Sequence, residues 1–197
     1  MNRIKQIFDI LNTLAGKRFI QSLKMIEDHC ASFGDIIAAG IISKFRDAFV
    51  KTTDLQEHER KGAVRYLVLS HLYSAVCTGG YSIKLDIFDQ RLYADPHEIN
   101  VYLRLDWLYN YLEEDMAYFR KELIKTHITG LREYEMEQIR YRYIYYYHAA
   151  VKTFISESMP ILLRLPEFVM LNVESEFEVL FGGYMDKAVV IWPKTLE

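Results

Sequence analysis

The sequence predicts an α+β fold: a predominantly helical body of five or six helices and a small antiparallel β-sheet that includes a C-terminal hairpin. Three observations support this prediction. Apolar residues recur every three or four positions over about 3–78 and about 96–157, which is the period of a helix. Residues 81–88 alternate between apolar and polar, as a half-buried strand does. A Gly-Gly pair separates two apolar runs near the C-terminus, which is a hairpin signal.

Length and composition predict one domain over 1–197. The chain has 197 residues, of which 51% are hydrophobic and 26% charged, and this is enough to bury a core without metal or disulfide support. Within that domain we expect a helical part over about 3–78 and 96–157. We expect β elements over about 81–88 and 168–192.

The first 78 residues predict four helices. Apolar stripes cover 3–14, 17–33 and 36–51, and Gly16 and Gly34 fall between them, where glycine typically ends a helix. A fourth helix is expected over about 55–78, closed by Gly79-Gly80.

The two long helices should form an antiparallel pair. Asp95-Pro96-His97-Glu98 has the pattern of a capping box with proline at the first helical position, so a helix is predicted over about 96–127. Gly130 separates it from a second helix over about 131–157, and a connection this short favours antiparallel neighbours.

The last 30 residues predict β-structure. If Gly182-Gly183 forms the turn, Glu178 lies opposite Lys187 and the two strands place their apolar residues on one face. Residues 168–173 are a candidate third strand.

Charge and cysteine content indicate the setting of the protein. The net charge is −3, which gives no electrostatic support for nucleic-acid binding. Cys30 and Cys77 are too few for a secreted disulfide framework, and we expect buried, reduced thiols in a cytoplasmic protein. No secretory signal or membrane-spanning segment is predicted.

Motifs for metal, cofactor or catalytic chemistry are missing. The sequence has no Glu-x-x-His, no His-Glu-x-x-His and no Cys-x-x-Cys, and it has neither a glycine-rich phosphate loop nor a Gly-x-Ser-x-Gly. His71 and Cys77, six residues apart on one predicted helix, should point about 120° away from each other. The acidic run 113–115 is expected to be a solvated helix face. We therefore predict no metal and no cofactor, and the absence of catalytic motifs favours a protein that is not an enzyme.

The most unusual feature is a tyrosine-rich run over 140–148, with five of the 15 tyrosines in seven positions. Helical spacing places Tyr143 and Tyr146 toward the core. A second stripe on the flank, together with Arg140, gives the candidate ligand- or partner-binding residues: Glu137, Arg140, Tyr141, Tyr145, His148 and Lys152. His148 is the candidate general base because its ordinary pKa suits neutral pH. In the alternative interpretation, the tyrosines fill a wide seam between helices.

These features lead to two functional hypotheses and a weaker third. The first is a non-enzymatic intracellular protein-binding or regulatory module that self-associates, as a homodimer, since aromatic residues near arginine are typical of interfaces. The alternative is a small-molecule-binding protein or enzyme with a Tyr/His-lined pocket between the long helices and the sheet. The third is nucleic-acid binding through Arg132, Arg140 and Arg142, which the acidic neighbourhood disfavours.

Overall fold

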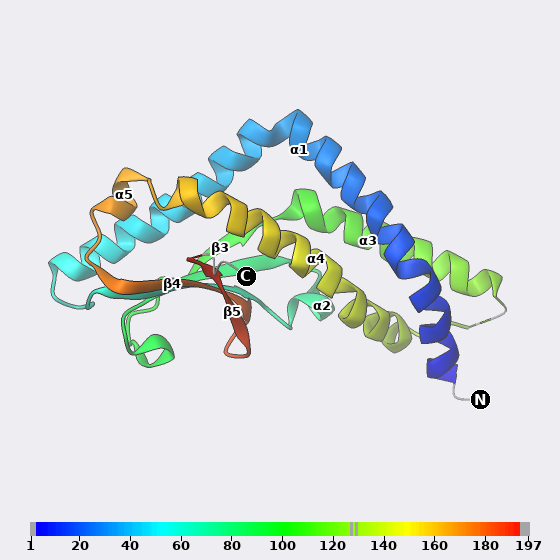
Figure 1. Cartoon of the computed structure of the whole chain (residues 1–197). Helices are drawn as coiled ribbons and strands as arrows, with labels where there is room; N and C mark the ends of the chain where they lie inside the picture. Colours follow the sequence, from blue (N-terminus) through cyan, green and yellow to red (C-terminus); the bar gives the residue numbers. More distant parts are fainter. Residues whose placement is uncertain (1–2, 127, 129, 194–197) are drawn as a thin grey trace.

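The computed structural model describes residues 3–126, 128 and 130–193. Within these residues the chain forms five α-helices and one five-stranded sheet with the strand order β3-β2-β1-β4-β5 (Figure 1), which confirms the α+β class. The elements are α1 (Arg3–Glu57), β1 (Val64–His71), α2 (Ala75–Thr78), β2 (Ser82–Phe88), the 3-10 turn η1 (Leu92–Ala94), β3 (Val101–Arg104), α3 (Asp106–Lys125), α4 (Glu133–Leu162), α5 (Pro166–Val169), β4 (Val173–Gly183) and β5 (Ala188–Trp192).

The three helices predicted over 3–51 are one helix, α1. Gly16 does not end it, because its neighbours Leu11 and Ala15 are buried against the other long helices and one glycine inside a helix costs only about 1 kcal/mol. The break expected at Gly34 corresponds to a kink at Phe33, whose φ of −127° and ψ of 16° are not helical. The kink turns α1 into an arch over the rest of the molecule (Figure 1).

The helix predicted over 55–78 is wrong. Residues 64–71 form β1, the central strand of the sheet, and residues 58–63 connect it to α1. All but two of the β1 residues are buried, so the strand has a nearly continuous apolar run instead of an alternation. A run of this kind does not distinguish a buried strand from a buried helix.

The sheet is mixed, which corrects the prediction of an antiparallel one. β1 pairs antiparallel with β2 and parallel with β4. The connection from β3 to β4 contains the two long helices α3 and α4, and a connection of that length allows a parallel pair. The strand expected over 81–88 is confirmed as β2.

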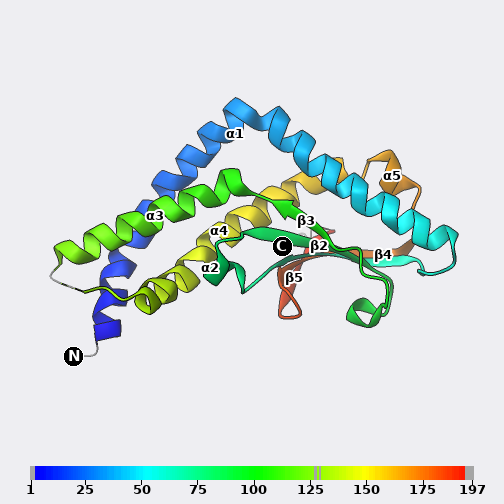
Figure 2. The same cartoon turned by 180° about the vertical axis from the view of Figure 1, so that it is seen from behind.

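The helix predicted over 96–127 begins ten residues too early, because α3 starts at Asp106 and residues 101–104 form β3. The carboxylate of Asp95 accepts a hydrogen bond from the backbone N–H of His97 at 3.0 Å and pairs with Lys61, so it caps no helix. Residue 127 lies outside the described residues. The helix predicted over 131–157 is α4, and it runs antiparallel to α3 (Figure 2).

The C-terminal hairpin is confirmed, but its turn is not where the glycines were expected to place it. Gly182 lies within β4 opposite Ala188, and the turn follows over 184–187. A Cβ at Gly182 would lie 2.3 Å from the carbonyl oxygen of Lys187, so glycine is needed there for the close approach of the strands. Residues 166–169 form α5, and the strand expected over 168–173 is absent from this part of the described chain.

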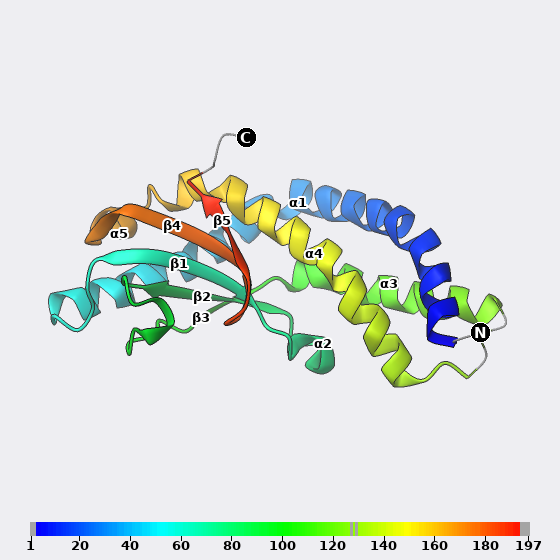
Figure 3. The same ribbon diagram turned by 60° about the horizontal axis from the view of Figure 1, so that its bottom comes forward.

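The long helices α1, α3 and α4 lie on one face of the sheet, and the segment around η1 lies on the other (Figures 1 and 3). Odd-numbered residues of β2 (Ile83, Leu85 and Ile87) belong to the main apolar core. Their even-numbered neighbours Lys84 and Asp86 are buried by the segment between β2 and β3.

One buried carboxylate connects the three long helices. Asp115 on α3 is fully buried and accepts hydrogen bonds from Arg18 Nε at 2.5 Å and Ser22 Oγ at 2.7 Å, both on α1. From α4, the hydroxyls of Tyr143 and Tyr147 donate to its other oxygen at 2.7 and 2.6 Å. Asp115 therefore does not belong to the solvated face that the acidic run 113–115 predicts.

Replacing Asp115 tests this network. Asp115→Ala leaves four donors, one of them a guanidinium, without their acceptor, so we expect a loss of about 3–5 kcal/mol in the free energy of unfolding. The matched control is Glu114→Ala, because Glu114 is the exposed neighbour in the same acidic run, and a change within about 0.5 kcal/mol is expected. Chemical denaturation measures both. Equal effects of the two substitutions would contradict the assignment.

Candidate functional site

Three of the six predicted site residues come together. Tyr141, Tyr145 and His148 of α4 line one small cavity with residues at the end of β1 and the start of α2. The other residues that line this cavity are His71, Leu72, Tyr73, Val76 and, from α4 itself, Ile144. The cavity has a volume of about 10 Å³, which is room for about one water molecule.

Two histidines form the centre of this cluster. The rings of His71 and His148 stack with centroids 3.9 Å apart, and the Nδ1 atom of each is buried without a hydrogen-bond partner. Burial, together with the neighbouring His71, lowers the pKa of His148 to about 3. Burial also lowers the pKa of His71, although Asp186 opposes this shift. Because a general base works best with a pKa near the working pH, His148 is a poor one.

The rim of the cluster carries hydroxyl and thiol groups. Tyr73 donates a hydrogen bond to Asp186 at 2.6 Å, and this bond raises the pKa of Tyr73 to about 12. Cys77, an exposed free thiol, lies 3.4 Å from the hydroxyl of Tyr141. Cys77 is therefore not the buried thiol that the sequence predicts. His71 and Cys77 do not share a helix, since one ends β1 and the other lies in α2.

The other three predicted residues do not reach the cavity. Arg140 forms an ion pair with Glu113 at 2.8 Å, and Glu113 also accepts a hydrogen bond from Tyr81. Glu137 is half-buried one turn before Tyr141, and Lys152 is exposed one turn after His148. Of the two tyrosines expected in the core, Tyr143 is buried and Tyr146 is 41% exposed.

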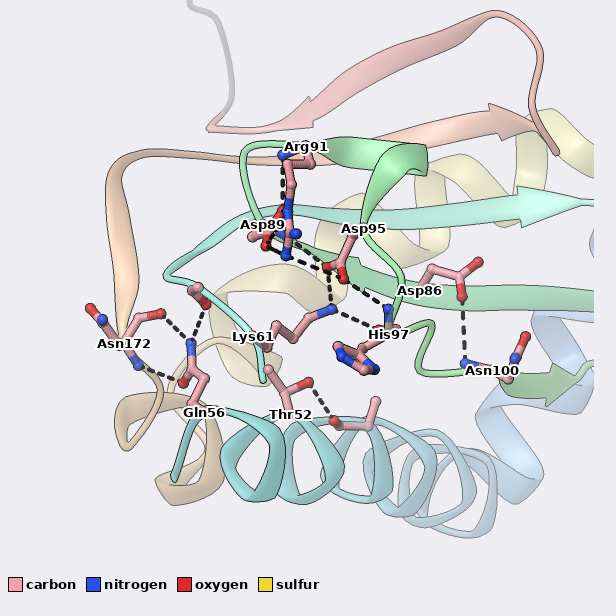
Figure 4. Close-up of polar contacts among 12 residues, drawn as sticks. Thr52, Gln56, Lys61, Asp86, Asp89, Arg91, Asp95, His97, Asn100 and Asn172 are labelled. Carbon is pink, nitrogen blue, oxygen red and sulfur yellow. Dashed lines mark hydrogen bonds and ion pairs between the residues drawn. The ribbon is translucent and has the colours of Figure 1, made fainter. Parts of the chain in front are cut away.

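A second polar cluster fixes the segment between β2 and β3 (Figure 4). The buried side chain of Lys61 pairs with Asp95 and donates to the carbonyl oxygen of His97 at 2.8 Å. Asp89 binds Arg91, and this hydrogen bond lowers the pKa of Asp89. Each of these charges has an opposite charge beside it, so the cluster is an anchor and not a reactive centre.

The middle of α1 contributes only partly buried residues to the core, among them Cys30 and Ile37. None of residues 27–40, which we call the middle segment of α1, is buried, whereas Ile26 and Ile41 on either side are. The segment is nonetheless apolar: Phe33 and Ile36 are 49% and 71% exposed. Large exposed apolar surface of this kind marks binding sites.

A groove runs between α1 and α4, both of which line its two parts. Its two adjoining cavities have volumes of about 510 and 140 Å³ and share Cys30 and Phe154. The floor includes Trp107 and Phe154, whose ring centroids lie 5.7 Å apart. Glu27 and Glu157 are the charged residues that line it. We call it the α1–α4 groove.

A further cavity adjoins α1 and shares Ile37, Ile41 and Trp107 with the α1–α4 groove; the elements around it are seen in Figure 2. It has a volume of about 550 Å³ and is bounded by α1, β3 and Trp107 of α3. We call it the β3 cavity. Its charged or titratable lining residues are His29, Lys44 and Arg104, apart from the phenol of Tyr102. The two hollows thus have rims of opposite charge.

Among the described residues, no three His, Cys, Asp or Glu side chains are grouped so that they could hold a metal ion. No helix of the described chain has a stretch both long and apolar enough to span a bilayer. No family model, curated protein or solved structure matches the chain.

The stacked histidines predict acid sensitivity. His148 has a pKa of about 3 in the folded protein and about 6.5 when unfolded, so the unfolded state binds the extra proton between these values. Above pH 6.5 neither state binds this proton, so the stability that His148 contributes is fully present. As the pH falls toward 3, the free energy of unfolding decreases by up to about 1.4 kcal/mol per pH unit. In His148→Phe the unfolding free energy should fall less steeply from pH 6.5 to 4.

Urea denaturation at a series of pH values measures this slope. The control is His58→Phe, because the side chain of His58 is 65% exposed and its replacement should leave the wild-type slope unchanged. A wild-type slope in the His148→Phe protein would show that His148 is not held neutral by burial.

Proposed function

We propose that the chain is a protein-binding module without chemistry of its own, and that its α1–α4 groove receives a basic amphipathic helix of a partner protein. The observation that supports this most is the apolar lining of the groove, to which α1 contributes Leu23, Ile26 and Ile42 and α4 contributes Phe154 and Ile161. We place this function in the cytoplasm because both cysteines are free thiols, the state that reducing compartments maintain.

The groove has the dimensions for a helix. Along α4 it extends from Tyr146 to Leu162, which is about 24 Å at the rise of an α-helix. An amphipathic helix of about four turns therefore fits, with its apolar face toward Trp107 and Phe154.

The charge of the groove selects the partner. Glu27 and Glu157 are exposed at the rim, and no Lys or Arg lines either of its two cavities. A helix with Lys or Arg flanking its apolar face gains favourable contacts at this rim, and charge complementarity also suppresses unsuitable partners.

A model peptide tests the groove directly. The probe is a fluorescein-labelled 16-residue peptide of Leu and Lys in an amphipathic helical pattern, followed by fluorescence anisotropy. We expect saturable binding, weakened at least tenfold by Ile161→Lys, because Ile161 lines the groove and is 65% exposed. The matched control is Ile124→Lys, since Ile124 is 55% exposed at the far end of α3.

A scrambled peptide of the same composition separates groove binding from simple charge attraction. It should bind at least tenfold more weakly than the patterned peptide. Equal binding of the two peptides, or equal binding to both lysine variants, would contradict the proposal.

Self-association is a second proposal, and it depends on β5. This strand is the last in the sheet order, it carries no charged residue, and its Val189 and Val190 are 53% and 44% exposed. An unprotected apolar edge pairs readily with another strand, and two copies of β5 aligned antiparallel form a symmetric dimer.

Native mass spectrometry of the untagged protein measures this association. We expect a species of twice the chain mass that Val190→Lys converts to monomer, because an edge lysine opposes strand pairing. The control is Val169→Lys, at a residue that is 71% exposed on α5. A monomer at every concentration, or a dimer unaffected by Val190→Lys, would show that β5 is not the interface.

A further inference from the structure

The β3 cavity differs from the α1–α4 groove in its charge. Its walls are apolar on three elements: Phe33, Ile36 and Ile37 on α1, Leu103 on β3 and Trp107 on α3. A volume of about 550 Å³ falls in the range of small-molecule sites, which are mostly apolar with a few polar groups that fix orientation.

The charged groups at this cavity are basic. Lys44 and Arg104 line it with His29, and no Asp or Glu is among its lining residues. The side chain of Lys44 lies 3.9 Å from Asp47, a long ion pair, and Arg104 lies 3.0 Å from Asp106. The side chains of Lys44 and Arg104 are 49% and 77% exposed. Each can therefore turn toward a ligand, because this breaks only a weak surface ion pair.

We infer that the β3 cavity binds a single-chain amphiphile with a carboxylate head, such as a free fatty acid. The acyl chain lies against Ile36, Ile37 and Trp107, and the carboxylate lies at the rim between Lys44 and Arg104. Arginine in particular matches the geometry of a carboxylate. This site adjoins the proposed peptide groove, with which it shares Ile37, Ile41 and Trp107, but of the two it alone is lined by Gly40, Lys44 and Arg104.

Gly40 offers a way to block the cavity without unfolding the protein. It lines the cavity, and a Cβ built on it meets no atom within 4 Å. Gly40→Leu therefore fills the space and also favours the helix. Gly16→Leu is the matched control, because Gly16 lies in the same helix with the same open surroundings and lines none of the cavities described above.

The experiment uses Trp107 as the reporter and dodecanoate as the probe. In a Trp192→Phe background Trp107 is the only tryptophan, and its fluorescence should change saturably on titration below the critical micelle concentration. Affinity should rise about fourfold for each methylene from octanoate to dodecanoate. Gly40→Leu should weaken dodecanoate binding at least tenfold, and Gly16→Leu should not change it.

The neutral analogue dodecanol tests the role of charge. The double variant Lys44→Gln, Arg104→Gln should weaken dodecanoate binding at least tenfold and leave dodecanol binding unchanged. Absence of saturable binding, equal binding to Gly40→Leu, or equal losses for acid and alcohol would overturn the inference. A further contradicting outcome is that free dodecanoate fails to bind while the protein sediments with anionic phosphatidylglycerol vesicles. If the double variant abolished that sedimentation, the site would recognise a membrane surface instead of a free fatty acid.

Discussion

The buried carboxylate of Asp115 sets how the three long helices sit against one another. Apolar faces alone would let α1 slide along α3 and α4, because hydrophobic contact has no direction. Asp115 removes that freedom: its four donors come from fixed positions on α1 and α4, and a buried acceptor is satisfied in one register only. Burial and the bonds to Asp115 raise the pKa of Tyr143 and Tyr147, so both phenols stay protonated as donors.

The arch of α1 follows from where this helix is held. Its first half is tied to α3 at Asp115 and to α4 through the pair of Arg3 with Glu135 at 2.6 Å. Its last turns are held by Phe49, which packs against Phe168 of α5 with ring centroids 5.2 Å apart. Between these attachments the helix is kinked at Phe33 and none of residues 27–40 is fully buried, so hollows remain beside it. The two proposed binding surfaces are thus consequences of how the long helices are packed.

Sequence patterns predicted what depends on local period. The helix α4 and the strand β2 were found because their residues recur or alternate on one face, and the hairpin β4–β5 was found from its glycine pair. Residues 64–71 lacked such a signal, since a central strand is apolar on both sides. Because this strand was missed, the positions of His71 and Cys77 were also predicted wrongly. The burial of Asp115 was beyond local reasoning, because its partners lie 28 to 97 residues away. Tyr141, Tyr145 and His148 of the predicted stripe line one cavity, but the stripe did not indicate how small that cavity is.

Hydrogen–deuterium exchange along α1 tests the central claim most directly. The helix α1 is anchored at both ends, and none of the residues of its middle segment, 27–40, is fully buried. The account predicts slow exchange in 7–23 and 45–52, and exchange at least tenfold faster in the middle segment of the isolated protein. Uniform protection along α1 would contradict it, because the middle segment would then be packed against something and could not serve as a free wall of either hollow.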